Sequence, residues 1–352
     1  MATPCILPYL GIHPNIGAGA VLAGTAAIIG RVVTGESLHL GPMAVMRADG
    51  YDIRIGSDCS FGARTSLHIV DSQLATVTGK HVSVGSFALV HACTVADDCV
   101  IGDEAVVMDD AKLGPGAVVA AGSFVSPRSD FDGGWLYAGT PAKPVRAVDP
   151  AELAALHQAL RGGVSNPLVC SPDLPSSEKP RPSVTGGGIP VIDASSYVAP
   201  TATLEGKVQL EKDASIWFSA AVLANDASIS IGERSNVQDN CLLETDSRRG
   251  PIMIDSDVTV GHNVRIGACV IGSDCLIGMG SSIGDGTQVE PGSCVAARAL
   301  CEPGTRVESG YIWAGRPARK FRQIKPEELE AFRHGRKIYV GYAHAYLAEL
   351  PS

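Results

Sequence analysis

The chain has 352 residues, 45% of them hydrophobic but only 5% aromatic, which is enough for two domains of ordinary size. Its net charge of -9 argues against nucleic acid as a partner. No run of about 18 apolar residues is present, so we expect no membrane span. The N-terminus, MATPCILPYLG, lacks a basic segment and a long apolar run, which predicts a cytoplasmic or mitochondrial-matrix protein that is not secreted.

Residues 1–161 are predicted to form a solenoid that ends in a helix over Pro150–Arg161. One aliphatic residue recurs there with a period of six: Leu89, Val95, Ile101, Val107, Leu113, Val119 and Val125. A small residue follows each of the first six by four places: Cys93, Cys99, Ala105, Ala111, Ala117 and Ser123. A helix has a period near 3.6 and a strand a period of 2, so this pattern indicates a parallel β-helix. The aliphatic residues are expected to point inward and the small residues to lie at the corners.

Residues 162–188 are rich in Gly, Pro and Ser and are predicted to be a linker. Residues 189–352 then repeat the first pattern, because an aliphatic series returns 176 positions later: Ile271, Ile277, Ile283, Val289 and Val295. A second helix is predicted from Pro326 to Leu350, with an amphipathic stripe that packs on the solenoid. The chain is therefore predicted to be a tandem duplication.

Ten cysteines are present, and most of them occupy the small-residue positions. No CxxC pair occurs, so we expect buried core thiols in a reducing compartment and no structural zinc cluster.

Three of the nine histidines, His68, His91 and His262, stand out by their position in the repeats. A shift of 176 residues places Glu244 opposite His68, Gly267 opposite His91, and His262 opposite Ser86. The other six are predicted to be surface or packing residues: His13, His39, His81, His157, His334 and His344.

In both halves, and over most of each, the sequence resembles the γ-class carbonic anhydrases. The resemblance rests on the Arg47-x-Asp49 motif, the NVQD stretch at 236–239, the three histidines, and the endings GTPAKPVR (139–146) and GRPARKFR (315–322). The endings also occur in hexapeptide acyltransferases. The resemblance implies an all-β solenoid of two left-handed parallel β-helix domains in tandem, each followed by a packing α-helix. Handedness is taken from the family, because parallel crossovers are otherwise right-handed in about 98% of cases.

In the family, three histidines bind one zinc or iron ion at the interface of a trimer. The first and third belong to one subunit and the second to its neighbour. The resemblance implies that the first half keeps the first and third ligands, His68 and His91, and that the second half keeps the second, His262. Only an interface between an N-terminal and a C-terminal solenoid would complete the site, with at most one Zn²⁺ or Fe²⁺ per hybrid interface.

The supporting residues of the family are divided in the same way. The first half keeps Arg47 and Asp49 but has Gly62 and Ala63 in place of the family's Gln-Asp. The second half keeps Gln238 and Asp239 but has Leu223 or Ala224 in place of the arginine, depending on a one-residue gap. The resemblance implies that Arg47 pairs with Asp239 across the hybrid interface.

The implied activity is the reversible hydration of CO2 by a carbonic anhydrase, which is a lyase. Three imidazoles leave zinc a fourth position, and the metal lowers the pKa of a water bound there to about 7. Gln238 is expected to orient the attacking hydroxide. In the most active family members glutamates carry the proton away, but Gly50 takes one such place here and the nearby loop offers only Asp71.

Two other functions are compatible with the sequence, which leaves open whether the protein is an enzyme. One is a non-catalytic assembly subunit, like those of the γ-carbonic-anhydrase module in mitochondrial complex I. The other is a hexapeptide acyltransferase with His91 as its base, although Arg47, Asp49 and the NVQD stretch argue against it. The expected assembly is a three-membered ring of β-helix domains, built from copies of this chain or completed by a single-domain homologue.

Overall fold

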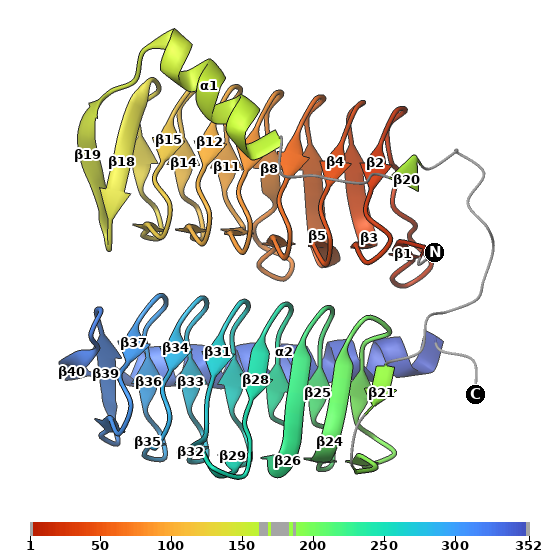
Figure 1. Ribbon diagram of the computed structural model, residues 1–352, viewed down its shortest axis with the longest axis vertical. Coiled ribbons are helices and arrows are strands. Elements are labelled where there is room, and N and C mark those ends of the chain that lie inside the picture. The colour runs from red at the N-terminus through yellow and green to blue at the C-terminus, as the bar shows by residue number, and fades with distance from the viewer. Residues whose placement is uncertain (1–2, 162–167, 170–182, 186–187, 350–352) are drawn as a thin grey trace. The chain divides into compact units, whose positions relative to one another are not determined.

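The computed structural model describes residues 3–161, 168–169, 183–185 and 188–349. It divides into two compact units, Met1–Lys179 and Pro180–Ser352. Each unit is an all-β, left-handed parallel solenoid followed by one helix (Figure 1). The predicted linker, 162–188, lies outside the described residues except for 168–169, 183–185 and 188.

Unit 1 contains two sheets that run along the solenoid. The first comprises β1 (Cys5–Leu7), β3 (Ala27–Thr34), β5 (Val45–Ile55), β7 (Ser66–His68), β8 (Thr76–Thr78), β10 (Leu89–His91), β11 (Thr94–Val95), β13 (Val106–Val107), β14 (Lys112–Leu113), β16 (Phe124–Val125) and β17 (Asp130–Phe131). The long strands β3 and β5 carry this sheet around a corner of the coil. The second comprises β2 (Val21–Leu22), β4 (His39–Leu40), β6 (Ser60–Phe61), β9 (Ser83–Val84), β12 (Val100–Ile101), β15 (Val118–Val119), β18 (Trp135–Gly139), β19 (Ala142–Ala147) and β20 (Leu168–Val169).

Unit 2 repeats this plan. Its first sheet comprises β21 (Ser183–Thr185), β22 (Val191–Ile192), β24 (Thr203–Leu210), β26 (Ala221–Ile231), β28 (Leu242–Glu244), β29 (Ile252–Ile254), β31 (Arg265–Ile266), β32 (Cys269–Ile271), β34 (Ser282–Ile283), β35 (Thr287–Val289), β37 (Leu300–Cys301) and β38 (Arg306–Val307). Its second comprises β23 (Tyr197–Val198), β25 (Ser215–Ile216), β27 (Asn236–Val237), β30 (Thr259–Val260), β33 (Leu276–Ile277), β36 (Cys294–Val295), β39 (Tyr311–Ala314) and β40 (Arg319–Gln323). Antiparallel hairpins, β18–β19 and β39–β40, close the two solenoids.

The corners of the coil are built from residues in the left-handed region of backbone conformation. In the regular part of unit 1 they recur every six positions with φ between 45° and 69°: Ala92, Asp98, Glu104, Asp110, Gly116, Gly122 and Arg128. The backbone N–H of a corner residue donates to a carbonyl one coil earlier, as Asp98 does to Lys80 over 3.0 Å. Aspartate and glycine suit these positions because both tolerate positive φ.

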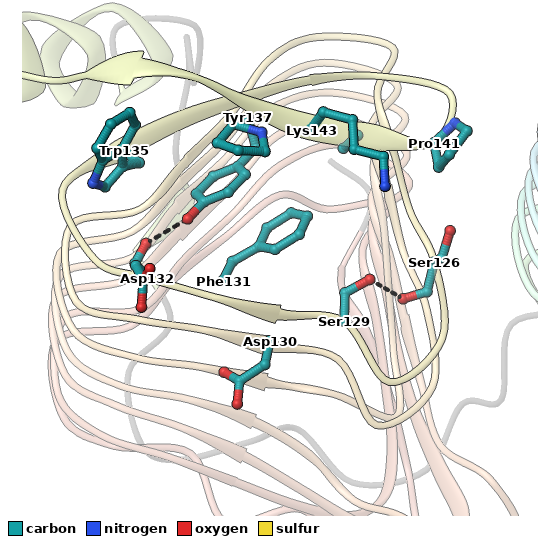
Figure 2. Close-up of a pocket in the computed structure, with 11 residues that line it drawn as sticks. Ser126, Ser129, Asp130, Phe131, Asp132, Trp135, Tyr137, Pro141 and Lys143 are labelled. Carbon is teal, nitrogen blue, oxygen red and sulfur yellow. Dashed lines mark hydrogen bonds between the residues drawn. The ribbon is translucent and has the colours of Figure 1, made fainter.

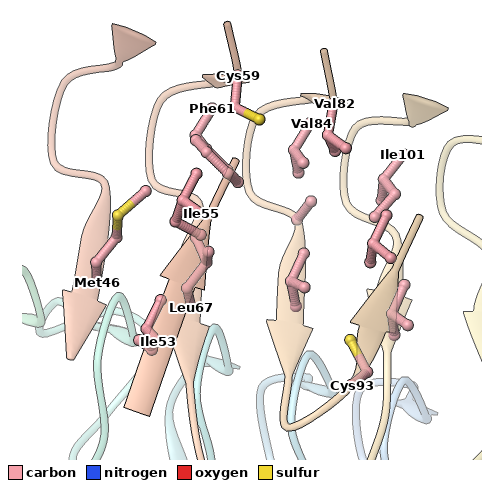
Figure 3. Close-up of a cluster of buried hydrophobic side chains, with 14 of the residues drawn as sticks. Met46, Ile53, Ile55, Cys59, Phe61, Leu67, Val82, Val84, Cys93 and Ile101 are labelled. Atoms are coloured by element: carbon pink, nitrogen blue, oxygen red, sulfur yellow. The ribbon is translucent and has the colours of Figure 1, made fainter. Parts of the chain in front are cut away.

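The interior is a single stack of aliphatic side chains, as the six-residue period predicted (Figure 3). Leu89 does not take the inward position that the series assigned to it. It pairs with Val106, whereas its neighbour Val90 pairs with the inward residue Val107 and belongs to the core. The cause is a coil shortened by one residue: Val95 pairs with Thr78, 17 positions earlier, whereas Leu113 follows Val95 by 18. The interpretation of Leu89 as an inward residue of the series was therefore wrong.

Each unit carries its helix on the second sheet. α1 (Pro150–Arg161) contacts β9 and β12, and α2 (Pro326–Glu349) contacts β23, β25 and β27. The predicted stripe of α2 is confirmed, since Tyr339, Tyr342 and Tyr346 are buried and all three rings lie against Trp217 at centroid distances of 5.2 to 6.4 Å. Among the described residues, neither helix combines the length and apolarity needed to cross a bilayer.

Replacing Ile101 by Ala should lower the free energy of unfolding by about 2–5 kcal/mol. The side chain is fully buried, so its loss leaves a cavity in the core that the neighbouring coils cannot fill. Val145→Ala is the matched control: Val145 is 57% exposed in β19, and its loss should change stability by less than about 0.5 kcal/mol. Chemical denaturation measures both. Equal effects of the two substitutions would contradict the stacked core.

Candidate metal centre

Two of the three predicted ligands lie side by side in unit 1. His68 ends β7 and His91 ends β10, and the two residues pair directly in parallel register on successive coils. Their rings lie 5.4 Å apart between centroids, and His68 Nδ1 is 3.4 Å from His91 Nε2. Coil stacking alone therefore aims one nitrogen of each ring at the other.

A carboxylate lies against the remaining nitrogen of each ring. Asp49 Oδ1 is 3.3 Å from His68 Nε2, and Asp109 Oδ1 is 2.6 Å from His91 Nδ1. Arg47 donates to the second oxygen of Asp49, so this carboxylate is itself held in place. The structure thus brings together the predicted residues His68, His91, Arg47 and Asp49.

This arrangement fits a metal such as zinc. Two nitrogens bound to one tetrahedral Zn²⁺ at about 2.0–2.1 Å lie about 3.3 Å apart, close to the separation of the two imidazole nitrogens here. Metal-ligating histidines almost always give their other N–H to a carboxylate or a carbonyl, as Asp49 and Asp109 allow. Two imidazoles are fewer than the three protein ligands of a typical catalytic zinc site, so unit 1 needs a further ligand.

The third predicted histidine has the same kind of support in unit 2. His262 follows β30, and its Nδ1 is 3.2 Å from Asp239 Oδ2. The other oxygen of Asp239 accepts the backbone N–H of Phe218 at 2.9 Å. On the far side of the ring, the hydroxyl of Tyr339 from α2 is 3.2 Å from His262 Nε2.

Gln238 precedes Asp239, the residue that supports His262 in unit 2. Its amide nitrogen donates to Asn236 Oδ1 at 3.2 Å. Its buried carbonyl oxygen accepts no hydrogen bond from the described residues. The structure thus brings together the predicted residues His262 and Asp239 in unit 2, with Gln238 adjacent to Asp239 in the chain.

Strand pairing decides the alignment that the sequence left open. Arg47 pairs with Ile29 in unit 1, and Leu223 pairs with Glu205 in unit 2, with both residues shifted by 176. Leu223, not Ala224, therefore stands at the place of Arg47.

Sequence reasoning missed Asp109 and the hydroxyl of Tyr339. Asp109 follows His91 by 18 residues and lies on the next coil, one place past the position in register with His91, so the solenoid period could have indicated it. Tyr339 was predicted only as part of a packing stripe, and the docking of α2 gives its hydroxyl a second role.

The cysteines do not compete as ligands. All nine that the structure describes are buried and unpaired by disulfides, as the sequence predicted. Burial strongly raises the pKa of the Cys93 thiol, two residues from His91, and the charge of Asp109 raises it further. Metals bind the thiolate, so this residue is unsuited to ligation.

A pocket of about 520 Å³ lies elsewhere, at the hairpin end of unit 1 (Figure 2). Phe131 and Tyr137 stack there at 3.9 Å between ring centroids, and the Tyr137 hydroxyl donates to the Asp132 carbonyl at 3.1 Å. None of the predicted site residues lines it.

Comparison with known protein families agrees with the six-residue repeats. A family model described as the hexapeptide repeat of succinyl-transferase matches residues 94–127 and 269–297. A solved structure described as a hexapeptide transferase family protein from Anaplasma phagocytophilum is 34% identical, with a TM-score of 0.45, over 47% of this chain and 98% of that one.

Two curated relatives bear on the family. "Gamma carbonic anhydrase 2, mitochondrial" of Arabidopsis thaliana is 34% identical over 46% of this chain and 59% of its own length, so the chain spans less than two thirds of that relative. "Carbonic anhydrase" of Geobacillus kaustophilus is 33% identical over 46% of this chain and 88% of its own length. With the six-residue repeats in both units and the carboxylate-backed histidines, this shows that the chain belongs to the γ-class carbonic anhydrase family of hexapeptide-repeat proteins, with the family's β-helix present twice in tandem.

Proposed function

We propose that this protein catalyses the reversible hydration of CO2 with a metal ion held by His68 and His91 of an N-terminal unit and His262 of a C-terminal unit. One observation carries the proposal: His68 Nδ1 and His91 Nε2 lie 3.4 Å apart with carboxylates behind both rings, and His262 has the same support from Asp239. The two units thus carry complementary parts of one ligand set.

Neither unit could hold the metal with its own copy of the three positions. Unit 1 has Ser86 where a third imidazole would be needed. Unit 2 has Glu244 and Gly267 at the places of His68 and His91. A pairing of unlike units, from one chain or from two, supplies three imidazoles, and a pairing of like units does not. The proposal therefore includes an oligomer or a folded-back chain in which unlike units meet.

The bound Zn²⁺ or Fe²⁺ would polarise a water at neutral pH. The chain's own residues would do the rest. Gln238 would use its carbonyl oxygen, which accepts no hydrogen bond from the described residues, to hold the proton of the attacking oxygen and so orient its lone pair toward CO2. Arg47, held by Asp49, would pair with Asp239 when unlike units meet.

A structural subunit without catalysis is the second candidate. The loop after β7 offers Asp71 as its carboxylate, and Gly50 follows the Arg47-x-Asp49 motif, so the chain is poor in groups that could carry a proton away. An acyltransferase is less favoured, because both nitrogens of its candidate base His91 face protein groups, Asp109 and His68.

We further propose that the protein acts in mitochondria or in the cytoplasm, since the Arabidopsis relative is named as mitochondrial.

Changing His262 to Ala should abolish CO2 hydration and remove the metal ion that His68 and His91 help to bind, because two imidazoles alone leave this ion short of a ligand. Elemental mass spectrometry of protein never exposed to chelator measures the metal, and stopped-flow hydration measures the activity. His334→Ala, an exposed histidine of α2, is the control and should change neither. A metal content that is unchanged without His262 would overturn the hybrid site, and metal absent from the unaltered protein would favour the structural subunit.

Co-expression of two inactive variants locates the interface. Chains with His68→Ala retain the ligand His262, and chains with His262→Ala retain the ligands His68 and His91. Mixed assemblies should regain CO2 hydration if unlike units of different chains meet, and should stay inactive if the site forms within one chain. Recovery in a mixture of His68→Ala and His91→Ala, which damage the same half of the site, would contradict the proposed division of ligands.

Asp109→Asn should weaken zinc binding by about 10–100-fold, because the ring of His91 loses the carboxylate that orients it. Asp110→Asn is a matched control one residue away, at an exposed corner whose φ of 56° asparagine also tolerates. Competition with a zinc-binding dye gives both dissociation constants. Similar constants for the two variants would show that Asp109 does not support the metal ligand.

A further inference from the structure

A second group of metal-ligating side chains lies in unit 1, under α1. His81 and Asp98 come from corners of the solenoid before β9 and β12, and His157 comes from the middle of the helix. Each of the three offers a ligand atom within 4.8 Å of those of the other two. The imidazole rings of His81 and His157 lie 4.3 Å apart between centroids. This cluster shares no residue with the site described above.

The hydrogen bonds of His157 define its protonation state. Its Nε2 donates to the backbone carbonyl of Asp98 at 3.2 Å, and its Nδ1 lies 2.7 Å from Ser83 Oγ. Ser83 Oγ already accepts a hydrogen bond from Ser60, so its own hydrogen points to His157 Nδ1. Burial lowers the pKa of His157 and the nearby His81 lowers it further. The ring is therefore neutral, which is the form that binds metals.

The equivalent place in unit 2 holds fixed positive charges instead. A shift of 176 residues turns His81, Asp98 and His157 into Asp257, Asp274 and Arg333. Arg333 Nη2 is 3.0 Å from Asp274 Oδ2, and Arg336 bridges Asp274 at 2.9 Å and Asp257 at 3.2 Å. In unit 2, guanidinium groups thus fasten the helix to the corner aspartates of the solenoid.

Unit 1 keeps the corner aspartate but lacks the guanidinium that faces it. Asp98 bonds to His81 Nδ1 at 2.8 Å, and Asp58 Oδ2 lies 3.9 Å from His81 Nε2. Arg161, at the end of α1, pairs with Asp58 at 3.1 Å and not with Asp98. Two carboxylates thus share one fixed cation. The local charge is negative, which favours a bound cation.

We propose that His81, Asp98 and His157 bind a divalent transition metal, of which Zn²⁺ is the best match, and that this ion fastens α1 to the solenoid as the arginines fasten α2. Two imidazoles and one carboxylate form a donor set that such ions prefer. The 2.8 Å between His81 Nδ1 and Asp98 Oδ1 is already close to the roughly 3.3 Å between two ligands of a tetrahedral zinc.

The third ligand needs only a change of hydrogen-bond partner. If His157 Nε2 turns from the Asp98 carbonyl to the metal, its proton moves to Nδ1, and Nδ1–H then donates to Ser83 Oγ. Metal-bound histidines usually donate this second N–H to an oxygen acceptor, and Ser83 Oγ would take that role here. Asp98 and His81 have side chains that are 56% and 40% exposed, so the ion can enter from solvent and keep water as a further ligand.

The test uses full-length, untagged chain carrying His68→Ala and His91→Ala, so that the inference does not rest on the proposed function. Equilibrium dialysis should show one zinc ion per chain. Hydrogen exchange of the α1 amides should slow by about 100-fold when free zinc is 100 times its dissociation constant, because the ion binds only the docked helix. Absence of bound zinc, or zinc that leaves this exchange rate unchanged, would overturn the proposal.

Unit 2 supplies the matched variant. His81→Asp with His157→Arg places the residues of unit 2 in unit 1, so the helix should stay docked while zinc affinity falls at least about tenfold. Should this double variant fail to fold, His81→Asn at the partly exposed ring gives the same readout. His344→Gln is the control, since His344 pairs with Asp213 at 2.9 Å on α2 but belongs to no three-ligand group among the described residues. Zinc affinity that survives His81→Asn, or falls equally with His344→Gln, would refute the site.

Discussion

Backbone hydrogen bonds between successive coils place the side chains that the solenoids contribute to both candidate metal sites. Neighbouring strands of a sheet lie about 4.8 Å apart, so residues in register on two coils present their side chains at nearly that spacing. His68 and His91 are such a pair, and their ring centroids lie 5.4 Å apart. Asp109 lies one coil further along and reaches the outer nitrogen of His91. A ligand pair and its supporting carboxylate thus come from the repeat geometry alone.

The same geometry explains how a duplicated chain could divide one site between two halves. Each coil is stabilised by its inward aliphatic residue and by its neighbours, not by the polar residue at a corner. Positions such as those of His68 and Glu244, or Ser86 and His262, can therefore diverge while the fold persists. On the proposed division of ligands, a tandem chain needs each of the three histidines only once.

The helices show a comparable divergence on a shared frame. In unit 2 the helix packs three tyrosines around Trp217, and Arg333 and Arg336 reach the corner aspartates. In unit 1 the shorter helix packs His157 among His81, Ser83 and the carbonyl of Asp98. The first docking depends on permanent charges and aromatic area, and the second combines the Arg161–Asp58 pair with imidazole hydrogen bonds.

The sequence by itself determined the solenoid, the tandem duplication and both helices, because a period of six is incompatible with an ordinary helix or strand. It also singled out His68, His91 and His262, since the shift of 176 residues exposes their complementary positions. The tertiary structure decided what depends on coil length. A coil one residue short puts Val90, not Leu89, in the core, and strand pairing puts Leu223 at the place of Arg47. It also decided which residues the helices bring to the solenoid: Ser83 and His157 are 74 positions apart, and Tyr339 and His262 are 77. No local period encodes such contacts, because they arise only when a folded helix docks on a finished sheet.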